Sequence, residues 1–164
     1  MITLQTPEFS RDMQSGEEDA VDALLRSAFP SPVMSLLVHK LRKSRGIAGE
    51  TVLPMRGRVV GYYALSHMVQ PRGWLALATV AIHPEMQQRG YGKRMMGVLT
   101  EWARLTNTPV VVVGEPAFFA KSGFSVADKA WPQSPCPPEH LMVAGLGTQS
   151  PAVDLVFPAA FKGL

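Results

Sequence analysis

The glycine-containing segment that joins an apolar run to an amphipathic one is the feature that most limits what this chain can fold into. It reads His83-Pro-Glu-Met-Gln-Gln-Arg-Gly-Tyr-Gly-Lys93. The run before it, Trp74 to Ile82, is almost uniformly apolar and predicts a strand covered on both faces. The pattern over Gln88 to Thr106 predicts a helix. Another apolar run, Pro109 to Val113, follows, so the order predicts a parallel strand–helix–strand unit with a ligand site at the strand ends. One side of this predicted helix carries the apolar residues Met95, Leu99, Trp102 and Ala103.

The rest of the chain predicts further elements on both sides of this unit. Before it come a strand over Ile2 to Thr6, a capping box over Ser15 to Glu18, a helix that stops before Pro30, a second helix around Met34 to Leu41, and a hairpin over Glu50 to Met55 and Arg58 to Val69. After it come a short helix over Ala117 to Lys121, a strand from Phe124, a proline-rich loop over 130–139, and a closing pair of strands over Leu141 to Leu146 and Val153 to Phe157. This order predicts a mixed α/β layer around one central sheet.

Composition excludes several classes of protein. The chain has 164 residues, about one domain's worth, and its single cysteine, Cys136, excludes a disulfide framework and a Cys-based zinc cluster. The net charge is only +3 and forms no basic arm, so a nucleic-acid-binding module is disfavoured. No secretory signal or membrane-length apolar run is present. We expect one soluble, cytoplasmic domain over 1–164.

The segment around Gly90 and Gly92 favours a phosphate-bearing ligand. Glycines let the backbone approach a ligand closely, and the first turn of the following helix offers unpaired N–H groups. Residues 86–106 carry four basic side chains and one acidic one, which favours an anion. A nucleotide P-loop would need glycine in place of Gln87, and a dinucleotide fingerprint would need a small residue in place of Met95. The physical interpretation is therefore a pyrophosphate bound to this loop.

Gln87-Gln-Arg-Gly-Tyr-Gly92 resembles the Gln/Arg-x-x-Gly-x-Gly/Ala motif of the GCN5-related N-acetyltransferases (GNAT), in which successive amides hold the pyrophosphate of coenzyme A. Leu77 to Glu85 is similar to the family's fourth strand and its exit, and Gly114 to Phe124 is similar to a segment of the YhbS-like subgroup. The resemblance covers nearly the whole chain. It implies the GNAT fold: a single mixed, mostly antiparallel sheet of six to seven strands flanked by about four helices.

The resemblance also implies acetyl-CoA as cosubstrate, without a metal, and direct attack of a primary amine on the thioester in a ternary complex. The amine would belong to a small molecule or a peptide, and a homodimer is possible in this family. Pantetheine would pair with the strand backbone, and an amide there would polarise the acetyl carbonyl. The residues expected to bind the cofactor are Val80, Ala81, Ile82, Gln87, Gln88, Arg89, Gly90, Tyr91, Gly92 and Lys93.

The sequence departs from the family pattern at Phe119. Family members usually place a tyrosine there to protonate the leaving thiolate, and a phenyl ring has no proton to give. A thiol with a pKa near 8.5 needs little help to leave, so an active acetyltransferase and a catalytically weak acyl-CoA-binding homologue both stay open. Glu115 is the candidate catalytic side chain, with stabilisation of a helix N-terminus as its alternative role. His83 is predicted to cap a turn.

Overall fold

The computed structural model describes residues 6–126, 140–147 and 153–163. In chain order, the strands are β1 (Arg11–Asp12), β2 (Ile47–Met55), β3 (Arg58–His67), β4 (Leu75–Ile82), β5 (Val110–Val113), β6 (Ser125–Val126) and β7 (Leu141–Ala144). The helices are α1 (Glu18–Ala28), α2 (Val33–Lys43), α3 (Tyr91–Thr106) and α4 (Pro116–Ala120), with single turns η1 (Pro84–Met86) and η3 (Ala159–Phe161).

The seven strands in the described residues belong to one sheet, in the order β1-β2-β3-β4-β5-β7-β6. Among these described strands, β4 and β5 run parallel to each other, and the other neighbouring pairs are antiparallel. The predicted mixed, mostly antiparallel sheet with about four helices is therefore confirmed, as is the parallel unit around α3.

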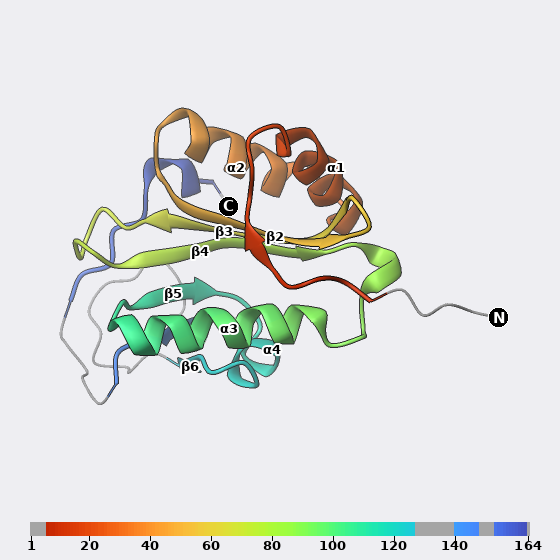
Figure 1. Cartoon of the computed structure of the whole chain (residues 1–164). Coiled ribbons are helices and arrows are strands. Elements are labelled where there is room, and N and C mark those ends of the chain that lie inside the picture. The colour runs from red at the N-terminus through yellow and green to blue at the C-terminus, as the bar shows by residue number, and fades with distance from the viewer. Residues whose placement is uncertain (1–5, 127–139, 148–152, 164) are drawn as a thin grey trace.

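Helices α1 and α2 cover one face of the sheet, and α3 and α4 cover the other (Figure 1). The consecutive residues Tyr62 and Tyr63 of β3 show how the two cores are separated. Tyr62 packs with Val21 and Leu25 under α1, whereas Tyr63 belongs to the cluster that contains Met95 of α3. Strand geometry sends neighbouring side chains to opposite faces, so one buried tyrosine serves each core.

The predicted capping box at Ser15 is wrong. Helix α1 begins at Glu18 with Glu17 as its N-cap and no side-chain cap bond. The carboxylate of Glu17 instead pairs with Arg11 at 2.9 Å and accepts a hydrogen bond from the backbone N–H of Gln14 at 2.7 Å. Because this ion pair ties the turn to β1, the turn closes around Glu17 instead of Ser15.

The prediction for α3 is wrong at the start of the helix. The helix begins at Tyr91 rather than Gln88, because Gln88 and Gly90 have φ angles of +64° and +83°, outside the helical region. Of the apolar residues predicted on one side of the helix, Met95 and Leu99 are buried, whereas Trp102 is 42% exposed.

The predicted strand over Val153 to Phe157 does not form. Strand β7 pairs with β5 and with β6, so both of its edges are occupied. The C-terminal segment instead reaches the β3–β4 connection, where Val156 and Gln70 form an isolated bridge. The loop over 130–139 and Cys136 lie outside the described residues, as does nearly all of the strand predicted over Ile2 to Thr6. Among the described helices, none is both long and apolar enough to cross a membrane.

Candidate active site

The site begins where β4 and β5 separate. These parallel strands pair only at Leu75 with Val110 and at Ala76 with Val111. Beyond these pairs β4 continues to Ile82 without β5 as a partner, so its edge is open on that side. An open strand edge carries N–H and C=O groups that an extended ligand can pair with.

On its other edge, where β4 pairs with β3, a register shift lies in the part of β4 that no longer pairs with β5. Ala64 of β3 pairs with Thr79, but the next pair joins Leu65 to Leu77, which leaves Ala78 without a partner in β3. Such a bulge changes the direction of the side chains that follow it. It brings Thr79 to the face covered by α1 and α2, in register with Ala64 of that core.

The loop between β4 and α3 presents a row of free backbone amides. None of the N–H groups of residues 88–93 donates a hydrogen bond to a carbonyl in the described part of the chain. The side-chain amide of Gln87 donates to the carbonyl of Ile82 at 3.0 Å and ties the loop to the strand end. Gln88 and Gly90 have φ angles in the left-handed region, a conformation that also occurs in the backbone of anion-binding nests. Free amides at the start of a helix are groups to which an anion can bind.

Basic side chains surround this loop. Lys93 and Arg89 are exposed, so both are accessible to a bound anion. Arg94 stacks over the ring of Tyr91, 5.2 Å from its centroid, and donates a hydrogen bond to the carbonyl of Glu8 at 3.2 Å. His83 caps η1, because its Nδ1 accepts from the amide of Glu85 at 3.2 Å, which confirms its predicted role.

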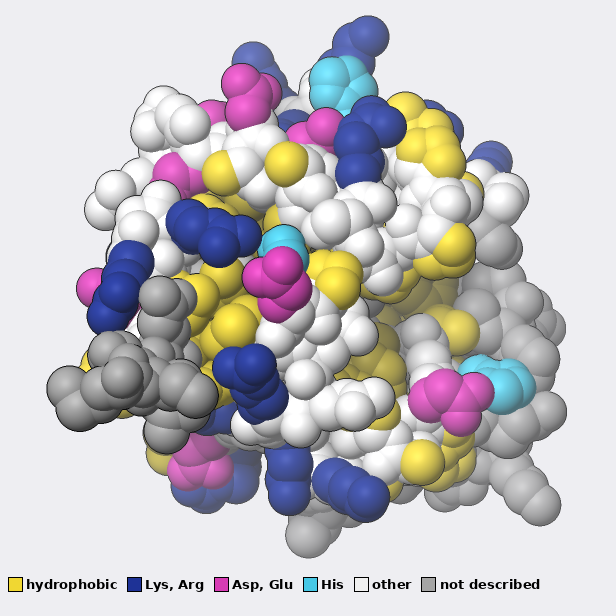
Figure 2. All heavy atoms as spheres, turned by 90° about the vertical axis from the view of Figure 1, so that its right-hand side faces the viewer, with side chains coloured by type: hydrophobic (Ala, Val, Ile, Leu, Met, Phe, Trp, Pro, Cys, Tyr) yellow, Lys and Arg dark blue, Asp and Glu magenta, His cyan; other side chains and the backbone are white. Residues whose placement is uncertain are grey.

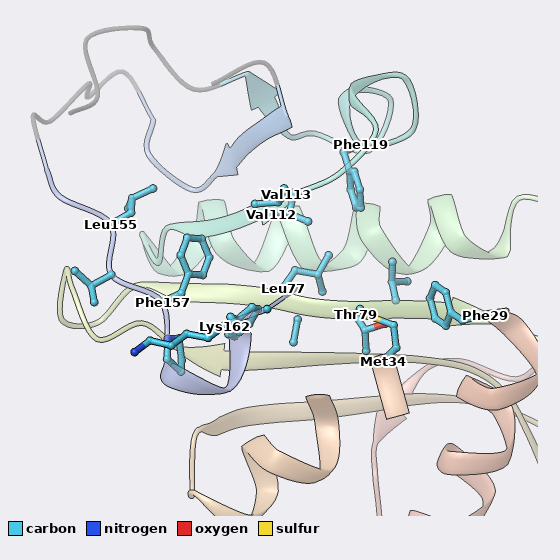
Figure 3. A pocket seen from close by; sticks show the side chains of 16 residues that line it. Phe29, Met34, Leu77, Thr79, Val112, Val113, Phe119, Leu155, Phe157 and Lys162 are labelled. Carbon is cyan, nitrogen blue, oxygen red and sulfur yellow. The ribbon is translucent and has the colours of Figure 1, made fainter. Parts of the chain in front are cut away.

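A cavity of about 760 Å³ lies along the separated strands. Most of its lining is apolar and comes from α1 and α2, β4, β5, α4 and the C-terminal segment. Its large apolar side chains are Phe29, Met34, Phe119, Leu155, Phe157 and Phe161. In Figure 3, Phe119 and Val112 lie on one side of β4, with Met34 and Phe29 on the other. Figure 2, which views the molecule from the end where α3 begins, shows hydrophobic side chains recessed below the surface, with Lys and Arg side chains spread over the same face.

Phe119 forms a rigid wall of this cavity. Its ring is 7% exposed and packs edge to face against Phe118 and Phe124, with centroids 5.0 and 5.5 Å away. Gly114 lies under the ring, and a Cβ there would come within 2.4 Å of the ring's Cε2. No Asp, Glu, His or Tyr is among the described residues that line the cavity, and Lys162 is its one titratable side chain.

The structure brings together most, but not all, of the predicted site residues. Val80 lines the cavity, Ala81 and Ile82 continue the same strand, and residues 87–93 form the loop directly after it. Glu115 is exposed at the N-cap of α4, forms no cap bond and does not line the cavity. Its catalytic role stays a prediction. Within the described residues, no group of three His, Cys, Asp or Glu side chains is arranged to hold a metal ion.

Sequence reasoning missed the opposite wall of the cavity. Phe29, Met34 and Phe157 come from segments far from the glycine loop, and no local pattern links them to it. Thr79 did carry a signal, because it is the one polar residue in Leu75–Ile82. A single polar residue in an apolar strand indicates either a buried partner or a ligand-facing position.

Comparison with known proteins places these features in context. Residues 18–124 match the model of the acetyltransferase (GNAT) family. The chain is 30% identical over 112 residues to the uncharacterised N-acetyltransferase YhbS of Escherichia coli K12, covering 65% of this chain and 67% of that protein. The crystal structure of Escherichia coli YhbS in complex with CoA has a TM-score of 0.79 at 23% identity, covering 94% of this chain and 92% of that one. A GNAT family acetyltransferase from Brucella melitensis in complex with acetyl-CoA has a TM-score of 0.77 at 19% identity, covering 93% and 97%.

Proposed function

The chain belongs to the acetyltransferase (GNAT) family, and from this premise we propose that it transfers the acetyl group of acetyl-CoA to a primary amine of a small molecule or peptide. One observation supports this proposal most strongly: the open edge of β4 is followed in the chain by the free amides of residues 88–93. The strand edge offers backbone hydrogen bonds for the pantetheine arm of coenzyme A, and the start of α3 offers N–H groups for its pyrophosphate. We propose that residues 1–164 form a single acetyltransferase domain.

In this proposal the loop binds the pyrophosphate of the cosubstrate. The amides of residues 88–93 donate to its oxygens, and Arg89 and Lys93 neutralise its charge. The pantetheine arm pairs with the backbone of Val80–Ile82 along the open strand edge. Two solved structures with the same fold contain CoA or acetyl-CoA, which supports this assignment.

The reaction is a direct transfer between two bound molecules. The neutral amine nitrogen attacks the thioester carbonyl carbon, a C–N bond forms, and the C–S bond breaks. A strand amide near Val80 stabilises the negative charge that develops on the carbonyl oxygen. The thiolate leaves and takes a proton from water, since Phe119 has none to donate and a thiol of pKa near 8.5 departs readily. The proton lost by the amine goes to solvent.

A second candidate function is binding of acyl-CoA with little or no turnover. It is favoured by Phe119 and by the scarcity of titratable side chains among the described cavity residues. A homodimer and a cytoplasmic location stay predictions, as does the absence of nucleic-acid and membrane partners.

Two measurements on the purified protein separate these candidates. Calorimetric titration with CoA and acetyl-CoA tests the cofactor site, and release of free thiol from acetyl-CoA in the presence of amines tests transfer. Binding with amine-dependent thiol release supports the acetyltransferase. Binding without release from any amine in a broad panel supports the second candidate, and no binding of either CoA species refutes both.

A further inference from the structure

The cavity beyond the separated strands has a chemical character that the family assignment does not specify. Its walls include the rings of Phe29, Phe119, Phe157 and Phe161, and the Phe157 and Phe161 rings pack at 5.4 Å between centroids. An aromatic and aliphatic wall of this kind favours an apolar ligand, because each buried apolar surface is removed from water.

Charge argues in the same direction. Among the described lining residues the charged side chain is Lys162, which is exposed at one end of the cavity. No described carboxylate lines it to neutralise a second ammonium group. A polyamine or a lysine-rich peptide would therefore place a positive charge against an apolar wall, which is costly without a partner.

One hydroxyl in the lining has no partner. Thr79 is 6% exposed, and its Oγ1 is buried without a hydrogen bond in the structure. Figure 3 shows Thr79 beside Met34 and Phe29, at the end of the cavity covered by α1 and α2. Buried hydroxyls are normally hydrogen-bonded, so an unpaired one at a ligand cavity indicates a group that the ligand satisfies. Met34 has a flexible thioether chain, so it can turn aside and admit that ligand.

We infer that the acyl acceptor is a primary amine on an uncharged apolar body, and that the hydroxyl oxygen of Thr79 accepts a hydrogen bond from an N–H of that amine, which leaves the nitrogen lone pair free to attack the thioester. This inference rests on the proposed acetyl transfer. The alternative occupant of the cavity is the chain of a longer acyl-CoA. Methylene groups cannot hydrogen-bond to a hydroxyl, whereas an amine N–H can donate to its oxygen, so Thr79 favours the acceptor.

The first test compares two amines with the same six-carbon chain, hexylamine and 1,6-diaminohexane, with acetyl-CoA as donor. The readout is amine-dependent thiol release, supported by calorimetric binding of each amine to the CoA-loaded protein. We expect kcat/KM for hexylamine to exceed that for the diamine at least tenfold. Equal or reversed preference overturns the inference, and so does failure of hexylamine both to react and to bind while CoA still binds. Failure of CoA itself to bind refutes the proposed function instead.

The second test removes the hydroxyl. Thr79→Val keeps the shape of the side chain, and Thr79→Ser keeps the hydroxyl. We expect Thr79→Val to raise KM for hexylamine about three- to tenfold with CoA affinity unchanged, and Thr79→Ser to restore most of the loss. Ser66→Ala is the matched control, because Ser66 is also buried with an unpaired hydroxyl but does not line the cavity. An unchanged KM in Thr79→Val, or an equal rise in Ser66→Ala, overturns the role of Thr79.

A third measurement distinguishes the two possible occupants. Hexanoyl-CoA and acetyl-CoA are titrated against the wild-type protein under the same conditions. Similar affinities support the assignment of the cavity to the acceptor. A hexanoyl-CoA affinity at least tenfold tighter, without a preference for hexylamine, assigns the cavity to the acyl chain and overturns the inference.

Discussion

Gly90→Ala tests the loop that carries the proposed cofactor site. Gly90 has φ of +83°, and a Cβ built there meets no heavy atom within 4 Å, so the cost is conformational rather than steric. An L-residue in this left-handed region costs about 1–2 kcal/mol. If the variant keeps the loop conformation, the free energy of unfolding falls by that amount. If the loop relaxes, the amides of residues 88–93 lose their alignment and the Kd for CoA rises by about 5- to 30-fold.

The same helix offers a matched control in Gly97→Ala. A Cβ at Gly97 also meets nothing within 4 Å, but this residue lies within α3, where its φ is not positive. Alanine there should stabilise the protein by about 0.5–1 kcal/mol and leave CoA binding unchanged. Urea denaturation measures the stabilities and calorimetry the affinities. If Gly90→Ala matches wild type in both stability and CoA affinity, the reasoning about this loop is refuted.

Three further predictions follow from the structure. Gly114→Ala should destabilise the protein by about 1–3 kcal/mol in urea denaturation, because its Cβ would overlap the ring of Phe119; wild-type stability would contradict this. Phe119→Tyr should raise kcat for thiol release by less than about tenfold, since the thiolate leaves unaided; a hundredfold rise would show that a proton donor was missing. Hydrogen bonding from Arg11 lowers the pKa of Glu17 from 4.5 to about 2, so its stabilisation is present above pH 4.5 and lost as pH falls toward 2. Because the Glu17–Arg11 pair is partly exposed, the free energy of unfolding should fall by less than about 1 kcal/mol from this source. Urea denaturation at pH 7 and pH 3 measures the fall, and this part of the pH dependence should be absent in Glu17→Gln.

Most of the fold could be predicted from the sequence because local periodicity encodes it. The hairpin around Arg56-Gly57 and the buried strand ending at Ile82 can each be recognised from the residue pattern of that segment alone. The errors occur where the local structure depends on a residue or strand that the local pattern does not include. Ser15 loses its predicted cap because Glu17 is paired with Arg11, and Val156 is not in a strand because β7 is already paired on both edges.

The candidate site also has one part that the sequence predicts and one part that it does not. Residues 87–93 follow β4 directly, so their position at the strand end is dictated by chain connectivity. The cavity wall formed by Phe29 and Phe157 depends on how α1 and the C-terminal segment dock on the sheet, and no local pattern encodes that contact. The sequence therefore predicts the proposed cofactor loop better than it predicts the proposed acceptor pocket.

Phe119 illustrates why a departure from a family pattern does not by itself decide activity. Its ring fills the space over Gly114 and packs against Phe118 and Phe124, so an aromatic side chain is required there for packing alone. Exchange of tyrosine for phenylalanine would keep that wall and remove only the hydroxyl. The groups that would bind the cosubstrate, and the amide proposed to stabilise the oxyanion, belong to the backbone of β4 and of residues 88–93, which this exchange does not touch. In such a site the barrier depends mainly on fixed backbone dipoles, so we expect the loss of one proton donor to lower the rate without abolishing transfer.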